Sequence, residues 1–301
     1  MDQLCSHTDQ PLQPLGKSAN GFAISNEGLV YSLDAHSVSY EDDYFFTDYE
    51  NQYGKSYQND EVNLRRLAKN RLERLNRIIQ NDTLNKNENR KYRLLEIGSA
   101  TGFFIDEANK AGFESIGIEV SGWACNKAKE MGLNVIHSSF LEFDQNTTKQ
   151  NHTKENTKLN SKPGLESNNH SETKDSFDVI AAFYVIEHFA EQNIIFNKIK
   201  QYLRPGGYFI FALPSTYGPL FRCNLPKWIA THPTDHYVDY SPLALKKILP
   251  LYQMKAIHFR PASYHQERSC GILKRIPNFL YRAYANLTSY GDTIEVIAKR
   301  I

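Results

Sequence analysis

From residue 94 onward, short apolar runs alternate with amphipathic stretches along the chain. The apolar runs have the length of buried strands, and they fall at residues 94–97, 115–120, 134–137, 177–182 and 208–213. Helical patterns separate them, at residues 103–111, 122–131 and 190–203. Because strands that alternate with helices form parallel sheets with right-handed crossovers, this order predicts an α/β protein.

Further elements are expected on both sides of this region. In residues 61–80, apolar residues recur at three- and four-residue steps, which is the period of a helix, and the basic residues between them predict a solvated basic face. Residues 242–251 predict another helix, and residues 254–259 and 293–298 predict the last two strands. Residues 1–60 do not share this pattern, so we expect an N-terminal arm or a small accessory element there.

Two segments interrupt the alternation. Residues 145–176 are almost entirely polar and cannot bury enough apolar surface to offset the entropy of ordering, so they predict a disordered surface insertion. Residues 261–292 form a long connection between the last two strands. They predict a lid over a binding site, a basic aromatic face for a lipid or a partner, or a packed helical insertion. Both insertions belong to one predicted domain, residues 61–301.

Composition and charge narrow the class of protein. The 35 lysines and arginines are matched by 34 acidic residues, so no nucleic-acid partner is expected, because phosphate binding needs clustered basic charge. The four cysteines are scattered and form no CxxC pair, so neither a disulfide nor a zinc site is expected, and reduced thiols indicate a cytoplasmic protein. No run approaches the ~18 apolar residues of a membrane span, while peripheral membrane contact stays open.

The first predicted strand ends in a glycine-containing turn that opens a helix, EIGSATG at residues 96–102. Gly98 lets the backbone turn sharply next to a ligand, and the helix start offers unpaired N–H groups. Ala100 stands where a dinucleotide-binding turn has its second glycine, which disfavours a pyrophosphate ligand and an oxidoreductase. Glu96 suits an ammonium group better than a phosphate. Glu119 ends the next strand, where Rossmann-type folds place an acidic side chain on ribose hydroxyls.

Three later motifs follow at regular places: FDVI at residues 177–180, VIEH at residues 185–188 and LRPGG at residues 203–207. With the glycine turn, they make the chain resemble the class I S-adenosylmethionine (SAM)-dependent methyltransferases, in particular the group with ubiquinone-pathway and sugar O-methyltransferases. The resemblance covers residues 60–300 apart from the polar insertion. It implies a Rossmann-like, seven-stranded mixed sheet with an antiparallel last strand, in three α/β/α layers, and it implies SAM as the cofactor.

The same resemblance assigns residues to the methionine and ribose parts of SAM. Glu96, Gly98, Ser99 and Gly102 are expected to border the methionine end. Glu119 is expected to hold the ribose.

For the adenine and the sulfonium, the resemblance points to residues after the third and fourth strands. Ser139 and Phe140 are expected beside the adenine, although many relatives have an acidic residue in place of Ser139. Phe183 and Tyr184 are expected to flank the sulfonium, which an aromatic face favours. Tyr53, in an aromatic stretch of the N-terminal segment, is expected to cover the cofactor.

Catalytic candidates follow the fourth strand. His188 is the leading general base because a histidine titrates near neutral pH, and a histidine fixed by hydrogen bonds at a helix start is the alternative. Glu187 binds a divalent metal in part of the family, but no companion carboxylates are evident, so no metal is expected. His236 precedes a helix in a segment that resembles the family's H-x-x-x-[FY]-S motif, and it is expected to face the acceptor pocket.

The predicted function is O-methylation of a small-molecule acceptor, with S-adenosylhomocysteine as the by-product. The alternatives are a methyltransferase that acts on protein or RNA, and a SAM-binding scaffold without catalysis. A basic rim around the pocket would favour the first alternative.

Overall fold

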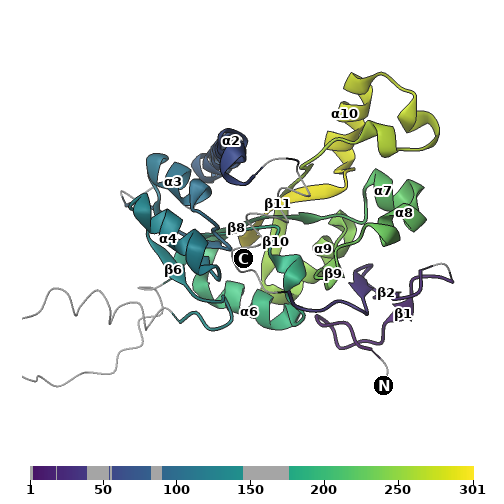
Figure 1. The fold of residues 1–301 in the computed structure, drawn as a ribbon, viewed down its shortest axis with the longest axis horizontal. Coiled ribbons are helices and arrows are strands. Elements are labelled where there is room, and N and C mark those ends of the chain that lie inside the picture. Colours follow the sequence, from purple (N-terminus) through teal and green to yellow (C-terminus); the bar gives the residue numbers. More distant parts are fainter. Residues whose placement is uncertain (1–2, 18, 39–53, 55, 83–89, 145–175) are drawn as a thin grey trace, which may run out of the picture.

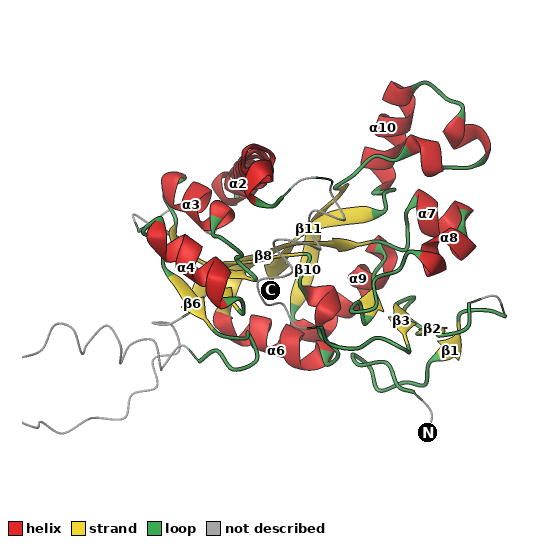
Figure 2. Ribbon diagram, in the orientation of Figure 1, coloured by secondary structure: helices red, strands yellow, loops and turns green. Residues whose placement is uncertain are grey.

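The computed structural model describes residues 3–17, 19–38, 54, 56–82, 90–144 and 176–301. At its centre lies a seven-stranded sheet with the strand order β10-β11-β8-β7-β4-β5-β6. Helices cover both faces of this sheet, which gives three layers (Figures 1 and 2). Most of the predicted polar insertion lies outside the described residues, as do Tyr53 and most of the aromatic stretch around it.

The sheet is mixed, as predicted. β11 pairs antiparallel with both of its neighbours, whereas every other pairing in the sheet is parallel. Because β11 is the single reversed strand, the carboxyl ends of the other six strands meet at one edge of the sheet. The strands are β4 (Arg93–Ile97), β5 (Glu114–Glu119), β6 (Val135–His137), β7 (Phe177–Phe183), β8 (Leu203–Pro214), β10 (Met254–Pro261) and β11 (Thr293–Arg300).

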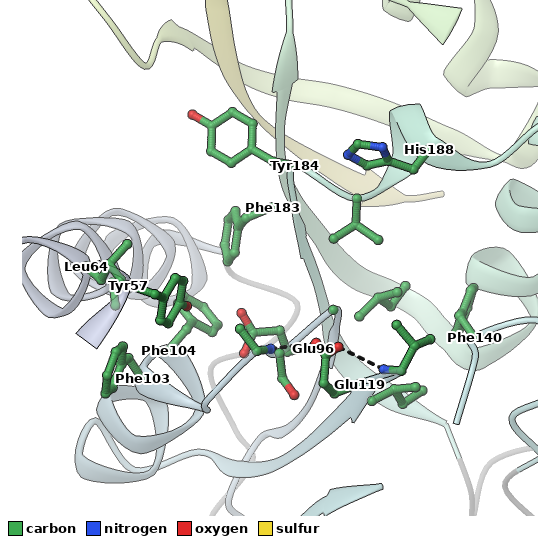
Figure 3. A pocket seen from close by; sticks show the side chains of 18 of the residues that line it. Tyr57, Leu64, Glu96, Phe103, Phe104, Glu119, Phe140, Phe183, Tyr184 and His188 are labelled. Atoms are coloured by element: carbon green, nitrogen blue, oxygen red, sulfur yellow. Dashed lines mark hydrogen bonds between the residues drawn. The ribbon is translucent and has the colours of Figure 1, made fainter. Parts of the chain in front are cut away.

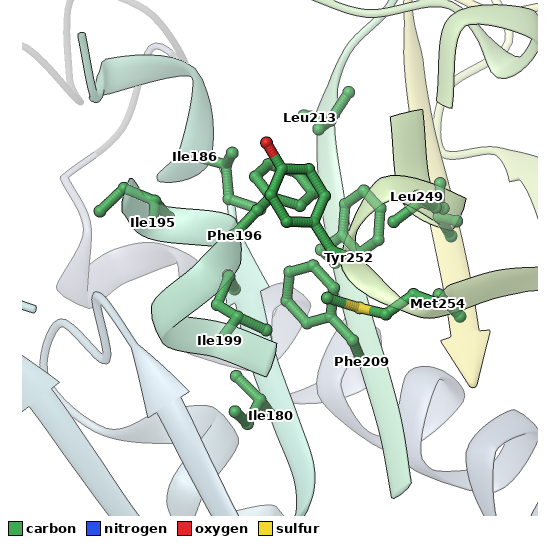
Figure 4. Packing of buried hydrophobic residues seen from close by; sticks show 14 of the residues in the cluster. Ile180, Ile186, Ile195, Phe196, Ile199, Phe209, Leu213, Leu249, Tyr252 and Met254 are labelled. Atoms are coloured by element: carbon green, nitrogen blue, oxygen red, sulfur yellow. The ribbon is translucent and has the colours of Figure 1, made fainter. Parts of the chain in front are cut away.

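Each face of the sheet has its own hydrophobic core. On one face, α2 (Glu61–Asn81), α3 (Phe103–Lys110) and α4 (Gly122–Glu130) bury apolar side chains against the central strands. On the other, α6 (Gln192–Tyr202) and α9 (Pro242–Ile248) pack on the same strands. Figure 4 shows this second core, where Phe196, Tyr252 and Met254 surround Phe209 of β8. The two cores fix the strand ends that carry the site.

The basic face of α2 is largely paired rather than solvated. Arg65 contacts Glu107 of α3 at 2.8 Å, and Arg71 and Arg74 contact the two carboxylate oxygens of Glu295 at 2.7 and 2.6 Å. The expectation of a solvated face is therefore wrong for these three arginines. The helical periodicity of α2 could not show that carboxylates of α3 and β11 would lie against its basic residues.

The N-terminal segment forms a second, smaller sheet. It contains β1 (Gln13–Pro14), β2 (Phe22–Ile24) and β3 (Val30–Ser32), and β3 pairs with β9 (Val238–Asp239). The His7 ring bonds the hydroxyls of Tyr240 and Tyr252 at 3.0 and 2.8 Å, and burial lowers the pKa of His7 to about 3. The segment is thus attached to the region around residue 240 by both strand pairing and side chains.

Residues 261–292 connect β10 to β11 through α10 (Asn278–Thr288), which projects from the sheet in Figure 1. Tyr281, Ala285 and Tyr290 form a small core of this segment. A disulfide joins Cys270 of the segment to Cys223 at the end of α7 (Pro219–Cys223), with a Cα–Cα distance of 5.6 Å. The expectation of no disulfide is wrong, because the fold brings together two cysteines 47 positions apart that share no local spacing motif.

At the LRPGG motif, residues 203–207, the sequence predicted a helix that ends at residue 203 and a strand that begins at residue 208. α6 ends at Tyr202, and β8 begins at Leu203, before the two glycines rather than after them. The pairing of β8 with β7 is irregular here, between Phe177 and Val179. Within the described part of the chain, no helix is long and apolar enough to cross a membrane.

Candidate active site

A cavity of about 420 Å³ opens at the carboxyl ends of β4, β5 and β7 (Figure 3). This volume lies in the range that small-molecule and cofactor sites occupy. The structure brings nine of the predicted site residues to its wall: Glu96, Gly98, Ser99, Glu119, Ser139, Phe140, Phe183, Tyr184 and His188. Gly102, Glu187 and His236 do not line this cavity, and Tyr53 lies outside the described residues, where its role stays a prediction.

The turn after β4 requires glycine at two points because the backbone is both left-handed and crowded there. Gly98 has φ +69°, and a Cβ at this position would lie 2.5 Å from Cγ2 of Val185. Gly102 has φ +86° and forms the N-cap of α3, where a Cβ would meet Leu133 at 2.6 Å. Gly98 thus shapes the cavity wall, whereas Gly102 shapes the helix start behind it.

Glu119 is held in place by the backbone on both sides of its carboxylate. One oxygen accepts a hydrogen bond from the N–H of Ala100 at 2.8 Å, and the other accepts from Val120 and Ser121, both at 2.9 Å. Burial raises the pKa of Glu119, although these three bonds act in the opposite direction. A carboxylate offers about four acceptor positions. Because three of them are used, Oε2 keeps one position that can accept a hydrogen bond from a hydroxyl of a diol in the cavity.

Glu96 differs from Glu119 because one of its oxygens is unpaired. Its side chain is 4% exposed, and Oε2 has no hydrogen-bond partner among the described residues. Burial raises the pKa of Glu96 well above its ordinary value, and Glu119 adds to this shift while Arg71 opposes it. A buried polar atom without a partner is costly. On a cavity wall, such an oxygen fits a cationic donor such as the ammonium group of SAM.

The remaining predicted cofactor residues line the other walls. Phe140 is buried, and the Ser139 hydroxyl donates to Glu142 at 3.0 Å, so a carboxylate does stand beside this position. The Phe183 ring packs under the guanidinium of Arg71, 4.0 Å from the ring centroid. Tyr184 has φ +58°, a left-handed conformation that residues other than glycine adopt mainly at special sites.

Sequence reasoning missed the contribution of α2 to the cavity. Leu64, Leu67, Ala68 and Arg71 line it, as does Tyr57 just before the helix, whose ring stacks on Phe103 at 5.8 Å. The apolar residues of α2 recur with the period of any packed helix. The hydrophobic pattern therefore could not show which of them line the cavity and which are buried in the core. Tyr57 belongs to the aromatic stretch that was expected to cover the cofactor.

At the opposite end of the cavity, His188 lies in a short 3-10 helix, η4 (Ile186–His188), after β7. Its Nδ1 is 3.0 Å from a carboxylate oxygen of Asp235. Burial alone would lower the pKa of His188, but the hydrogen bond and charge of Asp235, together with the charge of Glu187, raise it. The His236 ring lies 4.7 Å from the His188 ring, and burial lowers the pKa of His236 to about 4.

Glu187 is fully buried beside His188, and neither of its carboxylate oxygens has a hydrogen-bond partner among the described residues. Burial raises its pKa to about 7. Glu187, His188 and His236 each offer one ligand atom, and these atoms lie within 4.8 Å of one another, as they also do for His232, His236 and Asp239. Imidazole and carboxylate groups at this spacing could hold a divalent cation. Glu187 is the one carboxylate of the first group and Asp239 the one carboxylate of the second, so neither group brings two carboxylates together.

The glycine turn, the acidic residue that ends β5 and the reversed β11 together define a SAM-dependent methyltransferase of class I. A family model for the methyltransferase domain matches residues 63–258. The chain therefore belongs to the methyltransferase-domain family, and its cofactor is SAM. Among curated proteins, none has a sequence that matches this chain.

Solved structures agree with this fold. A possible histamine N-methyltransferase from Thermotoga maritima superimposes with a TM-score of 0.50 at 14% identity, over 86% of this chain and all of that chain (100%). A SAM-dependent methyltransferase from Archaeoglobus fulgidus gives 0.48 at 17% identity, over 85% and 99%. The magnesium protoporphyrin IX methyltransferase of Synechocystis, solved with bound S-adenosylhomocysteine, gives 0.49 at 11% identity, over 86% and 97%. At these identities the likeness concerns the fold alone.

Proposed function

We propose that the protein transfers the methyl group of SAM to an oxygen atom of a small-molecule acceptor, as do the ubiquinone-pathway and sugar O-methyltransferases that its sequence resembles. One observation carries the proposal. A single cavity has two buried carboxylates, Glu96 and Glu119, at one end and the paired histidine His188 at the other. The first end suits the cofactor, and the second suits removal of a proton from the acceptor.

Bound SAM supplies an electrophilic methyl group, and the residues of the chain hold and orient it. In our proposal, the unpaired Oε2 of Glu96 accepts hydrogen bonds from the ammonium group. Glu119, fixed by three backbone N–H groups, accepts from a ribose hydroxyl at its remaining acceptor position. Phe140 and Ser139 border the adenine. Much of the rate of such a displacement comes from alignment of the reacting atoms, which this rigid end of the cavity favours.

His188 is the proposed general base. Asp235 lies against Nδ1, and in our proposal the acceptor approaches the other ring nitrogen, Nε2. In its neutral form His188 would take the proton of the acceptor hydroxyl, and bound SAM would supply the methyl group that replaces this proton and leave as the thioether S-adenosylhomocysteine. Asp235 orients the ring and stabilises the imidazolium that forms. Glu187 and His236 lie behind His188 as positioning residues, and they are the residues that would hold a cation.

The charges of the cavity favour a small acceptor over RNA. Among the described residues that line it, Arg71 is the one arginine or lysine, whereas Asp60, Glu96 and Glu119 are acidic. An RNA-binding pocket carries a basic rim instead. A histidine on the cavity wall that is oriented by a carboxylate is what a general base requires, so the pairing of His188 with Asp235 supports the enzyme over a scaffold that only binds SAM.

Calorimetric titration of two adenosyl ligands tests this assignment. SAM carries both the ribose and the amino-acid end, whereas 5′-methylthioadenosine lacks the amino-acid end. We expect Glu119→Gln to weaken both ligands by tenfold or more, which corresponds to about 1.4 kcal/mol. Glu96→Gln should weaken SAM alone. Glu130→Gln, which changes an exposed carboxylate of α4, is the matched control and should change neither.

Equal losses for both ligands in the Glu96 variant would contradict the ammonium assignment. A folded wild-type protein that binds neither ligand would contradict the whole site. Once SAM binding is established, hydroxylated acceptors can be screened by release of S-adenosylhomocysteine. His188→Gln should then lose turnover while it keeps the affinity for SAM, and loss of both together would remove His188 from the role of base.

A further inference from the structure

The helix α10 is apolar on two opposite faces, which is unusual for a helix at the surface. Its inner face buries Tyr281 and Ala285 in the small core of the segment. On the opposite side, Phe279 is 69% exposed and Leu287 is 88% exposed, with Leu280 also exposed. Phe279, Ala283 and Leu287 follow at steps of four, so they form one stripe, which we name the outer face of α10. A helix that simply packed on the protein would have polar residues there.

The charges within residues 269–291, which include the outer face of α10, are all positive. Residues 269–291 contain no aspartate or glutamate, whereas Lys274, Arg275 and Arg282 lie among them. Lys274 and Arg275 are exposed and form no ion pair with another described residue, and Arg282 stacks on the ring of Tyr264 at 4.2 Å. Ile272, in the turn before the helix, is 75% exposed. The segment thus combines exposed apolar side chains with unneutralised basic ones.

The segment has a fixed position relative to the cavity. It leaves the sheet at Pro261, the end of β10, and returns at Thr293, the start of β11. β10 runs parallel to β4 and β7, so the segment stands on the same edge of the sheet as the cavity. The disulfide between Cys223 and Cys270 ties its base to α7. The segment that carries α10 therefore begins and ends at the edge of the sheet at which the cavity opens.

We propose that the outer face of α10, with Ile272 and the basic residues beside it, docks on the surface of an anionic lipid bilayer. The exposed apolar side chains would enter the headgroup boundary, and Lys274 and Arg275 would contact anionic lipids. Charge complementarity favours this occupant, because residues 269–291 offer three basic side chains and no acidic one, while Glu267 and Asp292 on either side of them pair with Arg268. The proposal does not depend on the identity of the acceptor or on catalysis.

Sedimentation with sucrose-loaded vesicles tests the proposal on the full chain. We expect binding to an equal mixture of phosphatidylcholine and phosphatidylglycerol, and much weaker binding to phosphatidylcholine alone. The pair Phe279→Ser and Leu287→Ser should reduce binding to the mixture by tenfold or more, and Lys274→Gln should reduce it about fivefold, as expected for one basic residue near the surface. Circular dichroism checks that each variant folds, which is expected because these side chains are exposed.

Matched controls are Val62→Ser, at an 83% exposed valine of α2, and Lys255→Gln, at an exposed lysine of β10. Both should bind vesicles like the wild type. Equal binding to the two kinds of vesicle, or unchanged binding of the α10 variants, would overturn the proposal. If light scattering instead shows a dimer that the serine variants abolish, while vesicles are not bound, the outer face of α10 is an interface between two copies of this chain and the proposal is wrong.

Discussion

The two ends of the cavity are built in different ways. At the cofactor end, Glu119 receives all three of its described hydrogen bonds from backbone N–H groups of the neighbouring turns, within 19 positions along the chain. At the acceptor end, His188 depends on Asp235, 47 positions away, and Glu187 has no hydrogen-bond partner among the described residues. The first end is thus fixed by local chain geometry, and the second depends on contacts between distant segments.

The two ends of the cavity therefore differ in how their hydrogen-bond partners respond to pH. Backbone donors do not change charge with pH, so the groups that hold Glu119 stay the same over a wide range, and the groups that titrate at this end include the carboxyl groups of Glu96 and Glu119, with raised pKa values. The acceptor end contains Glu187 and His188, whose pKa values are raised, and His236, whose pKa is lowered to about 4. A site that must accept a proton from its substrate uses groups of this kind. Substitutions at the two ends should therefore differ both in size and in their dependence on pH.

The largest effect is expected for Gly98→Ala at the cofactor end. Alanine adopts the left-handed conformation of Gly98 at a cost of about 1 kcal/mol, and its Cβ would press on Val185, a β-branched side chain with little freedom to move. Together these effects should lower the free energy of unfolding by about 2–4 kcal/mol. Urea denaturation measures this loss, and SAM affinity should fall with it.

Gly132→Ala is the matched control for this prediction. Gly132 has φ +74°, close to the +69° of Gly98, but a Cβ there would meet nothing within 4 Å. It should lose only the conformational part, about 1 kcal/mol, and it should bind SAM normally. If the two variants lose the same stability, the close approach of Gly98 to Val185 does not shape the cavity wall.

At the acceptor end, Glu187→Gln should change how stability depends on pH. The folded pKa of Glu187 is raised to about 7 from an ordinary value of 4.5, so between these values the folded chain binds more protons than the unfolded chain. Stability must therefore fall as the pH rises through this window. The neutral glutamine removes this loss, which amounts to at most about 3 kcal/mol. Urea denaturation at pH 5 and at pH 7.5 measures the difference.

His188 and His236 also make the free energy of unfolding depend on pH, so their contributions must be separated from that of Glu187. The raised pKa of His188 also makes stability fall as the pH rises, whereas the lowered pKa of His236 makes it rise between about pH 4 and 6.5. Glu191→Gln, which changes an exposed carboxylate four positions after Glu187, controls for the loss of a charge. A wild-type profile retained in Glu187→Gln would mean that Glu187 is ionised in the folded protein across this range.

The comparison also explains how far the sequence could predict the site. The order of strands and helices and the mixed sheet were predictable because apolar periods report burial, and Glu96, Gly98 and Glu119 stand in motifs whose spacing fixes their place at strand ends. The cavity wall formed by α2 was not predictable, since Leu64 and Leu67 look like ordinary core positions. Asp235 could not be assigned to His188, because no local pattern records a contact between segments that are distant along the chain.

The disulfide and the ion pairs of α2 also join segments that are distant along the chain. Cys223 and Cys270 belong to different elements, and only the path of the chain from β10 through α10 to β11 brings them together. Glu295 of β11 likewise meets Arg71 and Arg74 because β11 inserts between β8 and β10, beneath α2. Charge and cysteine spacing along the sequence carry no information on such pairings.

The smallest effect is expected for Asp235→Asn, which tests the long-range contact of the acceptor end directly. The asparagine keeps the size of the side chain but removes its charge, so the pKa of His188 should fall, because its hydrogen bond to Asp235 and the charge of that carboxylate both raise it. Loss of this charged hydrogen bond should cost about 1–2 kcal/mol of unfolding free energy below the pKa of His188, and less above it, where the ring is neutral. NMR titration of the histidine ring signals gives the pKa, and Glu191→Gln again serves as the control. A His188 titration that Asp235→Asn leaves unchanged would mean that the two side chains do not pair in solution, and the proposed base would then lack the partner that orients it.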